Sequence, residues 1–97
     1  MIRADLIVNA AVFEDLLENL QASDLADHYT VYNSVHGKGR SGSRFGTPVW
    51  PEENVHILIM MDQEKTQALQ SVFSNLKAQF PKAGMKCYLT GNVTENV

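Results

Sequence analysis

The stretch that decides the fold is Val55–Met61, whose sequence is VHILIMM. Apart from His56 it is a continuous apolar run, which is typical of a central strand covered on both faces. Asp62 follows as a candidate N-cap, and apolar residues then recur at helical spacing until Pro81 ends the pattern. The sequence therefore predicts a buried strand followed directly by an amphipathic helix.

The N-terminal part of the chain predicts a similar pair of elements. Residues 2–9 alternate between apolar and polar, as a strand does, and Asn9 can cap the helix that follows. From Ala10 to about Gln21 one helical stripe is apolar and comprises Val12, Phe13, Leu16, Leu17 and Leu20. The β-rich residues 29–36 and the segment 84–90 are the two remaining predicted strands.

The order of these elements is β-α-β-β-α-β within one domain that spans residues 1–97, the order of the ferredoxin-like motif. Right-handed crossovers place both helices on one face of a four-stranded antiparallel sheet, which gives an α+β fold. The other sheet face then needs a cover, and in so short a chain further subunits are the economical source. We therefore expect an oligomer.

Composition and charge exclude several classes of protein. Hydrophobic residues make up 44% and charged residues 20% of the chain, as in an ordinary globular domain. The formal net charge of −3 argues against a nucleic-acid partner, because neutralising phosphates dominates such binding. Cys87 is the single cysteine, so no internal disulfide framework exists. Charges within the apolar N-terminal stretch argue against a signal peptide or membrane insertion, and we expect a cytoplasmic protein.

Residues 37–54 differ from the rest of the chain in composition. They hold four of the six glycines and two of the three prolines, which predicts a long loop between two strands. Glycine backbone amides can point into a common concavity, and nearby cations suit phosphate or carboxylate recognition. The candidate ligand-binding residues are Gly37, Lys38, Gly39, Arg40 and Arg44. They predict a site for a small anion such as a nucleotide's phosphates; the alternative is a solvated hairpin tip whose charges serve solubility.

The second half of this loop places the only tryptophan, Trp50, between Pro48 and Pro51. Prolines limit the entropy that a loop loses when it orders, so Trp50 and Phe45 are candidates for anchoring a partner protein. The alternative is that both rings pack on their own subunit or on a neighbour.

His36 and His56 flank the loop at nearly equal distance from its centre. In a symmetric hairpin they would lie opposite one another, with Cβ atoms about 4.5–5.5 Å apart, where a metal or a neighbouring carboxylate could bridge them. Two histidines are an incomplete metal site, so structural or exposed histidines are the alternative. No nucleophile–base pair can be assembled from the chain, so we predict no catalytic residue and expect a protein that is not an enzyme.

The segment Val35–Arg40, with the sequence VHGKGR, is similar to the Val-x-Gly-x-Gly-Arg entry to the T-loop of the PII signal-transduction superfamily, particularly its short PII-like members. Val55–Met61 resembles the strand that receives this loop, and Asp62 then opens the second helix. The resemblance covers nearly the whole chain in element order. It implies a homotrimer whose sheets pack together, with nucleotide clefts between subunits at the base of each T-loop.

The resemblance also implies a function. Family members sense adenine nucleotides (ADP, AMP or ATP), sometimes with a small carboxylate or bicarbonate, and reposition the T-loop on a transporter, enzyme or regulator. Carried over by position, Gly37, Gly39 and Arg40 would form the loop base that touches the ligand, and Lys38 could join them. Trp50 and the loop tip would contact the effector protein.

The chain departs from the typical nitrogen regulators in three respects. Its loop is shorter, with no tyrosine at the tip, and it ends soon after the fourth strand. Only Pro-Lys-Ala separates Phe80 from Gly84, where those proteins carry a glycine-rich, basic phosphate-binding loop. We therefore do not expect the usual pair of ATP and 2-oxoglutarate, but a weaker adenine-nucleotide site or a different small ligand.

A trimeric metal-binding or cation-tolerance protein of the CutA-like kind, which shares the architecture, is the alternative from another class. It would use His36 and His56, with Cys87 or a carboxylate as a further ligand. Metal content after purification, and its loss in His56→Ala, distinguishes this alternative from a nucleotide-binding regulator.

Overall fold

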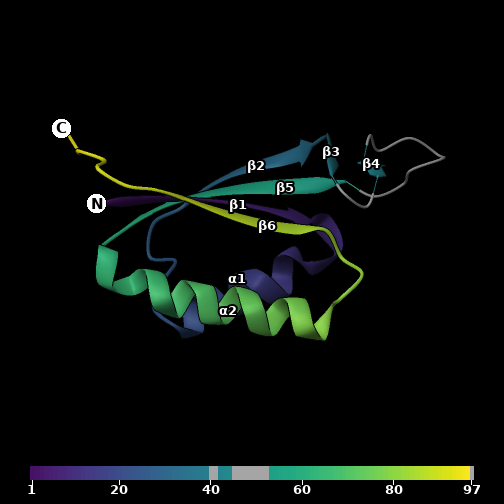
Figure 1. Cartoon of the computed structure of the whole chain (residues 1–97), viewed down its shortest axis with the longest axis horizontal. Helices are drawn as coiled ribbons and strands as arrows, with labels where there is room; N and C mark the ends of the chain where they lie inside the picture. Colours follow the sequence, from purple (N-terminus) through teal and green to yellow (C-terminus); the bar gives the residue numbers. More distant parts are fainter. Residues whose placement is uncertain (40–41, 45–52, 97) are drawn as a thin grey trace.

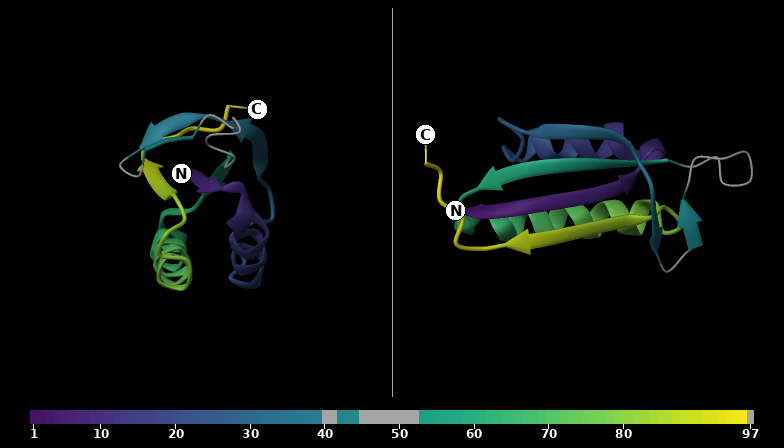
Figure 2. Two further views of the ribbon diagram at one scale, coloured as in Figure 1. Left: turned by 90° about the vertical axis from the view of Figure 1, so that its right-hand side faces the viewer. Right: turned by 90° about the horizontal axis from the view of Figure 1, so that it is seen from above.

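Four antiparallel strands in the order β2-β5-β1-β6 form one sheet, and both helices lie on the same face of it (Figures 1 and 2). The computed structural model describes residues 1–39, 42–44 and 53–96. In chain order the elements are β1 (Ile2–Asn9), the 3₁₀ turn η1 (Ala10–Val12), α1 (Phe13–Ala22), β2 (Thr30–Val35), β3 (Gly37–Gly39), β4 (Gly42–Arg44), β5 (Asn54–Met61), the 3₁₀ turn η2 (Gln63–Lys65), α2 (Thr66–Gln79) and β6 (Met85–Thr90). The predicted ferredoxin-like α+β fold is confirmed.

The first helical segment begins at a polar cap. The side-chain oxygen of Asn9, the last residue of β1, accepts a hydrogen bond of 2.8 Å from the backbone amide of Ala11. This bond satisfies one of the amides that the start of a helix leaves without an intrahelical partner. The capped segment is the 3₁₀ turn η1, and the α-helix starts only at Phe13. The prediction of a helix from Ala10 is therefore correct for the cap and one turn early for α1, because 3₁₀ turns often open helices.

The second helix is also preceded by a 3₁₀ turn, and a proline follows its end. Asp62 occupies the predicted cap position before η2 but makes no side-chain capping bond there. α2 ends at Gln79, where the amide of Phe80 still donates to the carbonyl of Leu76 at 2.9 Å. Pro81 follows and cannot extend the helix, because it lacks an amide hydrogen and its ring clashes with the preceding turn. The predicted end of this helix is confirmed.

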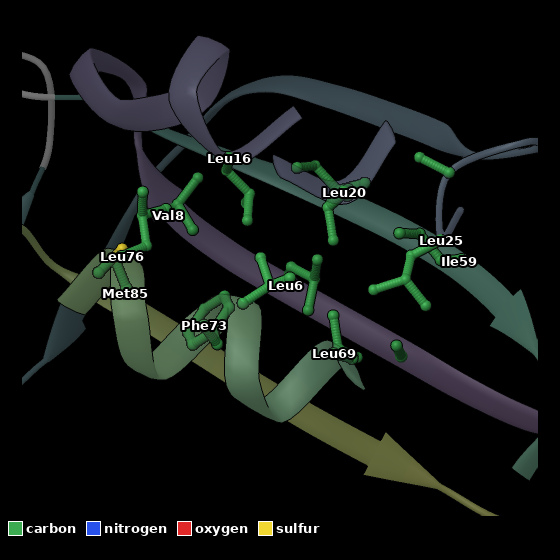
Figure 3. Packing of buried hydrophobic residues seen from close by; sticks show 14 of the residues in the cluster. Leu6, Val8, Leu16, Leu20, Leu25, Ile59, Leu69, Phe73, Leu76 and Met85 are labelled. Carbon is green, nitrogen blue, oxygen red and sulfur yellow. The ribbon is translucent and has the colours of Figure 1, made fainter. Parts of the chain in front are cut away.

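The hydrophobic core lies between the sheet and the two helices (Figure 3). Alternate residues of the two central strands point toward the helices and are at most 6% exposed: Ala4, Leu6, Val8, Val55, Ile57, Ile59 and Met61. Apolar side chains on the facing sides of α1 and α2 cover them, chiefly Leu16, Leu20, Leu69, Phe73 and Leu76. Each of these side chains larger than alanine contributes about 1.5–3 kcal/mol to folding, so this layer dominates the stability of the chain.

The face of the sheet away from the helices, which we call the open face, has no cover within the described chain (Figure 2). Strand register and alternation assign to it Arg3, Asp5, Ile7, Thr30, Tyr32, His56, Leu58, Met60, Lys86, Tyr88 and Thr90. The prediction that Val55–Met61 is covered on both faces is thus wrong for a single chain: burial alternates along β5, and Met60 is 42% exposed. The apolar run is continuous because Leu58 and Met60 also lie on the open face, not because a second helical layer covers it.

The connection between β2 and β5 contains more regular structure than the sequence predicts. β3 and β4 form a small antiparallel hairpin in which Gly37 pairs with Arg44, Lys38 with Ser43 and Gly39 with Gly42. The sequence did not predict these short strands, because glycine has a low β-propensity. Figure 1 shows the hairpin at one end of the sheet, away from the chain termini. Among the described residues, no helix is long and apolar enough to cross a membrane.

Candidate functional site

Four of the five predicted anion-binding residues lie in the short hairpin that follows β2. The β3–β4 pairing brings the backbones of Gly37, Lys38, Gly39 and Arg44 into one hairpin. Arg40 lies outside the described residues, as do the predicted partner-binding residues Phe45 and Trp50. Glycine-flanked backbone amides and nearby cationic residue types suit a small anion.

Glu53, the residue just before β5, is tied to the rigid part of the molecule. The amide of Ala10 donates to the carbonyl of Glu53 at 2.7 Å, and the amide of Asn9 donates to the carbonyl of Gly84 at 2.9 Å. The start of β5, the end of β1 and the turn before β6 therefore meet at one place.

A β-bulge interrupts β2 just before the hairpin. Tyr32 pairs with His56, but Val35 pairs with Asn54, so β2 holds one residue more than β5 over this interval. Ser34, within the bulge, has a φ of 57°, and its hydroxyl donates a 2.9 Å hydrogen bond to Oε2 of Glu53. Sequence reasoning missed this feature, because no glycine or asparagine marks the position of the left-handed backbone.

The predicted symmetric pairing of His36 with His56 is wrong. His56 lies opposite Tyr32, with ring centroids 5.3 Å apart, whereas His36 lies beyond the end of β2. The strand register is the physical reason: β2 and β5 pair Tyr32 with His56 and Val35 with Asn54, so the two strands are not paired symmetrically about the centre of the loop.

His56 belongs instead to a charged cluster on the open face. Its Nε2 donates to Oδ1 of Asp5 at 2.8 Å, and Arg3 donates to both oxygens of the same carboxylate, with Nε–Oδ2 at 3.0 Å and Nη2–Oδ1 at 3.1 Å. The hydrogen bond from Arg3, with that from His56, lowers the pKa of Asp5 against the opposing effect of partial burial. A neighbouring carboxylate was one of the predicted partners of His56, but its identity could not be deduced without the strand register.

Cys87 lies on the other side of the sheet from this cluster. It pairs with Leu6 in the β1–β6 register and lines a shallow hollow between α2 and β6. Burial raises the pKa of its thiol, as in a core residue. His56 and Cys87 therefore cannot share a metal within one chain. In the described ranges 1–39, 42–44 and 53–96, no three His, Cys, Asp or Glu side chains gather as metal ligands.

Comparison with known proteins identifies relatives by structure alone. The sequence matches no protein-family model and no curated protein. Among solved structures, it is similar to CPII bound to ADP and bicarbonate, from Thiomonas intermedia K12: the TM-score is 0.75 at 18% identity, over 92% of this chain and 82% of that one. The chain has the fold of the PII-like proteins.

Two further solved structures extend the likeness to other organisms. A DUF3240 family protein from Shewanella baltica OS155 matches with a TM-score of 0.69 at 13% identity, over 99% of this chain and 94% of that one. A putative PII-like signaling protein from Thermus thermophilus matches with a TM-score of 0.60 at 14% identity, over 92% of this chain and 82% of that one. The resemblance to PII-like proteins predicted from Val35–Arg40 and Val55–Met61 is thereby confirmed for the fold. Because the sequence identities are this low, a ligand for this chain has to be argued from the residues of the chain itself.

Proposed function

We propose that this chain is a non-enzymatic PII-like regulatory protein that binds an adenine nucleotide between subunits and signals through residues 37–54. The observation that carries the proposal is the match, over 92% of the chain, to a PII-like protein solved with ADP and bicarbonate. A further structure of the same neighbour contains ADP, AMP and bicarbonate. ADP and AMP are accordingly the first candidate effectors, ahead of ATP.

The open face supports a homotrimeric assembly. Helices cover only one face of the sheet, while Tyr32, Met60 and Tyr88 on the other are 50%, 42% and 55% exposed. Large apolar and aromatic side chains gathered on one face mark an interaction surface. Packing of three sheets through this face would complete the core of a chain too short to cover it alone. It would also create the clefts between subunits in which the nucleotide binds.

The hairpin supplies the groups that recognise the anionic part of the ligand. In the proposed site the loop-base residues are Gly37, Lys38, Gly39, Arg40 and Arg44. The ligand then shifts the loop toward one arrangement, because it binds that arrangement more tightly than the others. Phe45 and Trp50 would present that arrangement to an effector protein.

Calorimetric titration with ADP, AMP and ATP, each with and without bicarbonate, tests the proposal. Arg40→Ala is expected to weaken nucleotide binding at least fivefold, which corresponds to about 1 kcal/mol for a lost charge-assisted hydrogen bond, and to leave the assembly intact. Lys77→Ala, which removes a cation from the exposed side of α2, is the matched control and should bind as the parent does. Equal affinities of the parent and Arg40→Ala, or no affinity in the parent, would refute the proposal.

A further inference from the structure

Ser34, in the β-bulge before the hairpin, has a backbone conformation that serine rarely adopts. Its φ of 57° lies in the left-handed region, which glycine, asparagine and aspartate tolerate but most other residue types do not. The other non-glycine residues with positive φ in the described part of the chain are Asp24 and Asn92, both of tolerant types. Ser34 is therefore held in this conformation by its surroundings, and such positions often serve function.

The side chain of Ser34 makes the contact that holds it. Its hydroxyl donates to Oε2 of Glu53 at 2.9 Å, a bond that joins the last residues of β2 to the residue just before β5. Glu53 is itself fixed, because its carbonyl accepts the amide of Ala10 at 2.7 Å and the next residue, Asn54, pairs with Asn9 of β1. The hydroxyl of Ser34 is thus attached to the rigid side of the connection.

The bulge determines how the chain enters the hairpin. In the register of Thr30–Tyr32, the partner of Asn54 would be Ser34, but the structure places Val35 there. A one-residue shift exchanges the faces to which successive side chains point, and a bulge adds a bend and a stronger twist to its strand. Because β2 ends at Val35 and the hairpin begins at Gly37, this bend sets the direction of the backbone where the hairpin starts.

We infer that Ser34 and Glu53 form a positioning pair that holds the bulge and so fixes the direction in which the ligand-binding hairpin leaves the sheet. The inference rests on the proposed function for its consequence, that the pair presents the loop base to an adenine nucleotide. Neither side chain contacts the ligand in this arrangement. The pair acts by keeping the unliganded loop close to its ligand-binding arrangement, which reduces the free-energy cost of ordering the loop on binding.

Backbone hydrogen exchange over residues 35–44, measured without ligand, tests the positioning pair directly. Glu53→Ala and Ser34→Gly remove the hydrogen bond from either side, and glycine still permits the positive φ. Each is expected to speed exchange in this segment by roughly three- to tenfold, the range for one lost hydrogen bond, with exchange in β1 unchanged. The double variant should be no faster than Ser34→Gly, since both substitutions remove one interaction. Fluorescence anisotropy of Trp50, the only tryptophan, gives a second readout.

Two further variants separate the hydrogen bond from the charge. Glu53→Gln keeps an acceptor oxygen and should stay within twofold of the parent, while Glu64→Ala removes an exposed carboxylate from η2 at the other end of the sheet and should change nothing. Additive effects in the double variant, or equal exchange in Glu53→Ala and Glu53→Gln, would overturn the positioning pair. Titration with ADP then separates the two proposals. A parent protein that binds neither ADP nor AMP refutes the proposed function, while the exchange rates still decide the role of Ser34 and Glu53.

Discussion

The two faces of the sheet are built from the same strands and yet differ in almost every property. On the helix-covered face the side chains of β1 and β5 are aliphatic, and those of Leu6 and Ile57 are fully buried. On the open face the same strands carry the Arg3–Asp5–His56 cluster between Tyr32 and Tyr88. The first face is buried by the helices of the same chain, whereas the open face combines exposed aromatic side chains with polar groups that are already hydrogen-bonded to one another.

This difference indicates what each face is for. A buried aliphatic face stabilises the fold by its area alone, and nearly any shape-compatible apolar set would serve. Hydrogen bonds from Arg3 and His56 to Asp5, already made in the free chain, lower the desolvation penalty that these polar groups would meet against another protein surface. The open face is thus suited to specific association in a way that the helix-covered face is not.

The largest expected effect comes from adjacent substitutions that point to opposite faces of β1. Leu6→Ala creates a cavity in the core and should lower the free energy of unfolding by about 3 kcal/mol. Ile7→Ala, on the open face, should lower it by less than half as much at low protein concentration. Urea denaturation followed by circular dichroism measures both. Equal losses for the two variants would contradict the distinction between the faces.

An effect on assembly without an effect on folding is expected at Tyr88, which is 55% exposed on the open face. Tyr88→Glu places an unpaired charge where the proposed subunits meet, so the association constant should fall at least tenfold while the circular dichroism spectrum is retained. Sedimentation equilibrium provides the measurement. Gln70→Glu, which adds the same charge to the exposed side of α2, is the control and should assemble normally. A Tyr88→Glu protein that assembles as the parent does would show that the open face is not the interface.

The smallest effect is expected from the charged cluster, and it depends on pH. The pKa of Asp5 is lowered in the folded chain, chiefly by its hydrogen bond with Arg3. Its contribution to stability is therefore complete above the pKa of the unfolded chain, about 3.9, and is lost as the pH falls through the lower folded value. Asp5→Asn should be less stable than the parent at pH 7, and the gap should narrow below about pH 4. Thermal unfolding across this range measures the gap, and a constant difference down to pH 2 would assign the effect to packing instead.

Much of the fold could be predicted from local pattern. Three signals each involve only a few neighbouring residues and can therefore be recognised in the sequence. They are the alternation of residues 2–9, the apolar run Val55–Met61 and the helix stop at Pro81. The family resemblance likewise rested on the contiguous segment Val35–Arg40 and led to the correct fold. The anion-binding assignment of Lys38, Arg40 and Arg44 stays a prediction.

What could not be predicted depends on register between strands far apart in the chain. Asp5 and His56 are 51 residues apart, and Ser34 and Glu53 are 19 apart, so neither pair has a sequence signature. The β2–β5 register places Tyr32 rather than His36 opposite His56, so the symmetric arrangement on which the predicted histidine pair depended does not form. Such a register is set by pairing across the whole sheet, and no residue near either histidine specifies it.

By itself, the sequence determined the order of the two helices and the four strands of the main sheet, the helix-covered core and the PII-like resemblance, because hydrophobic periodicity and caps are local properties of the chain. Only the tertiary structure decided which polar groups meet: the Arg3–Asp5–His56 cluster on the open face and the Ser34–Glu53 pair below the hairpin. These contacts depend on antiparallel pairing and on a single inserted residue in β2, which bring side chains distant in sequence within hydrogen-bonding distance. Pairing of that kind is set by the packing of the whole sheet, and no short stretch of sequence contains it.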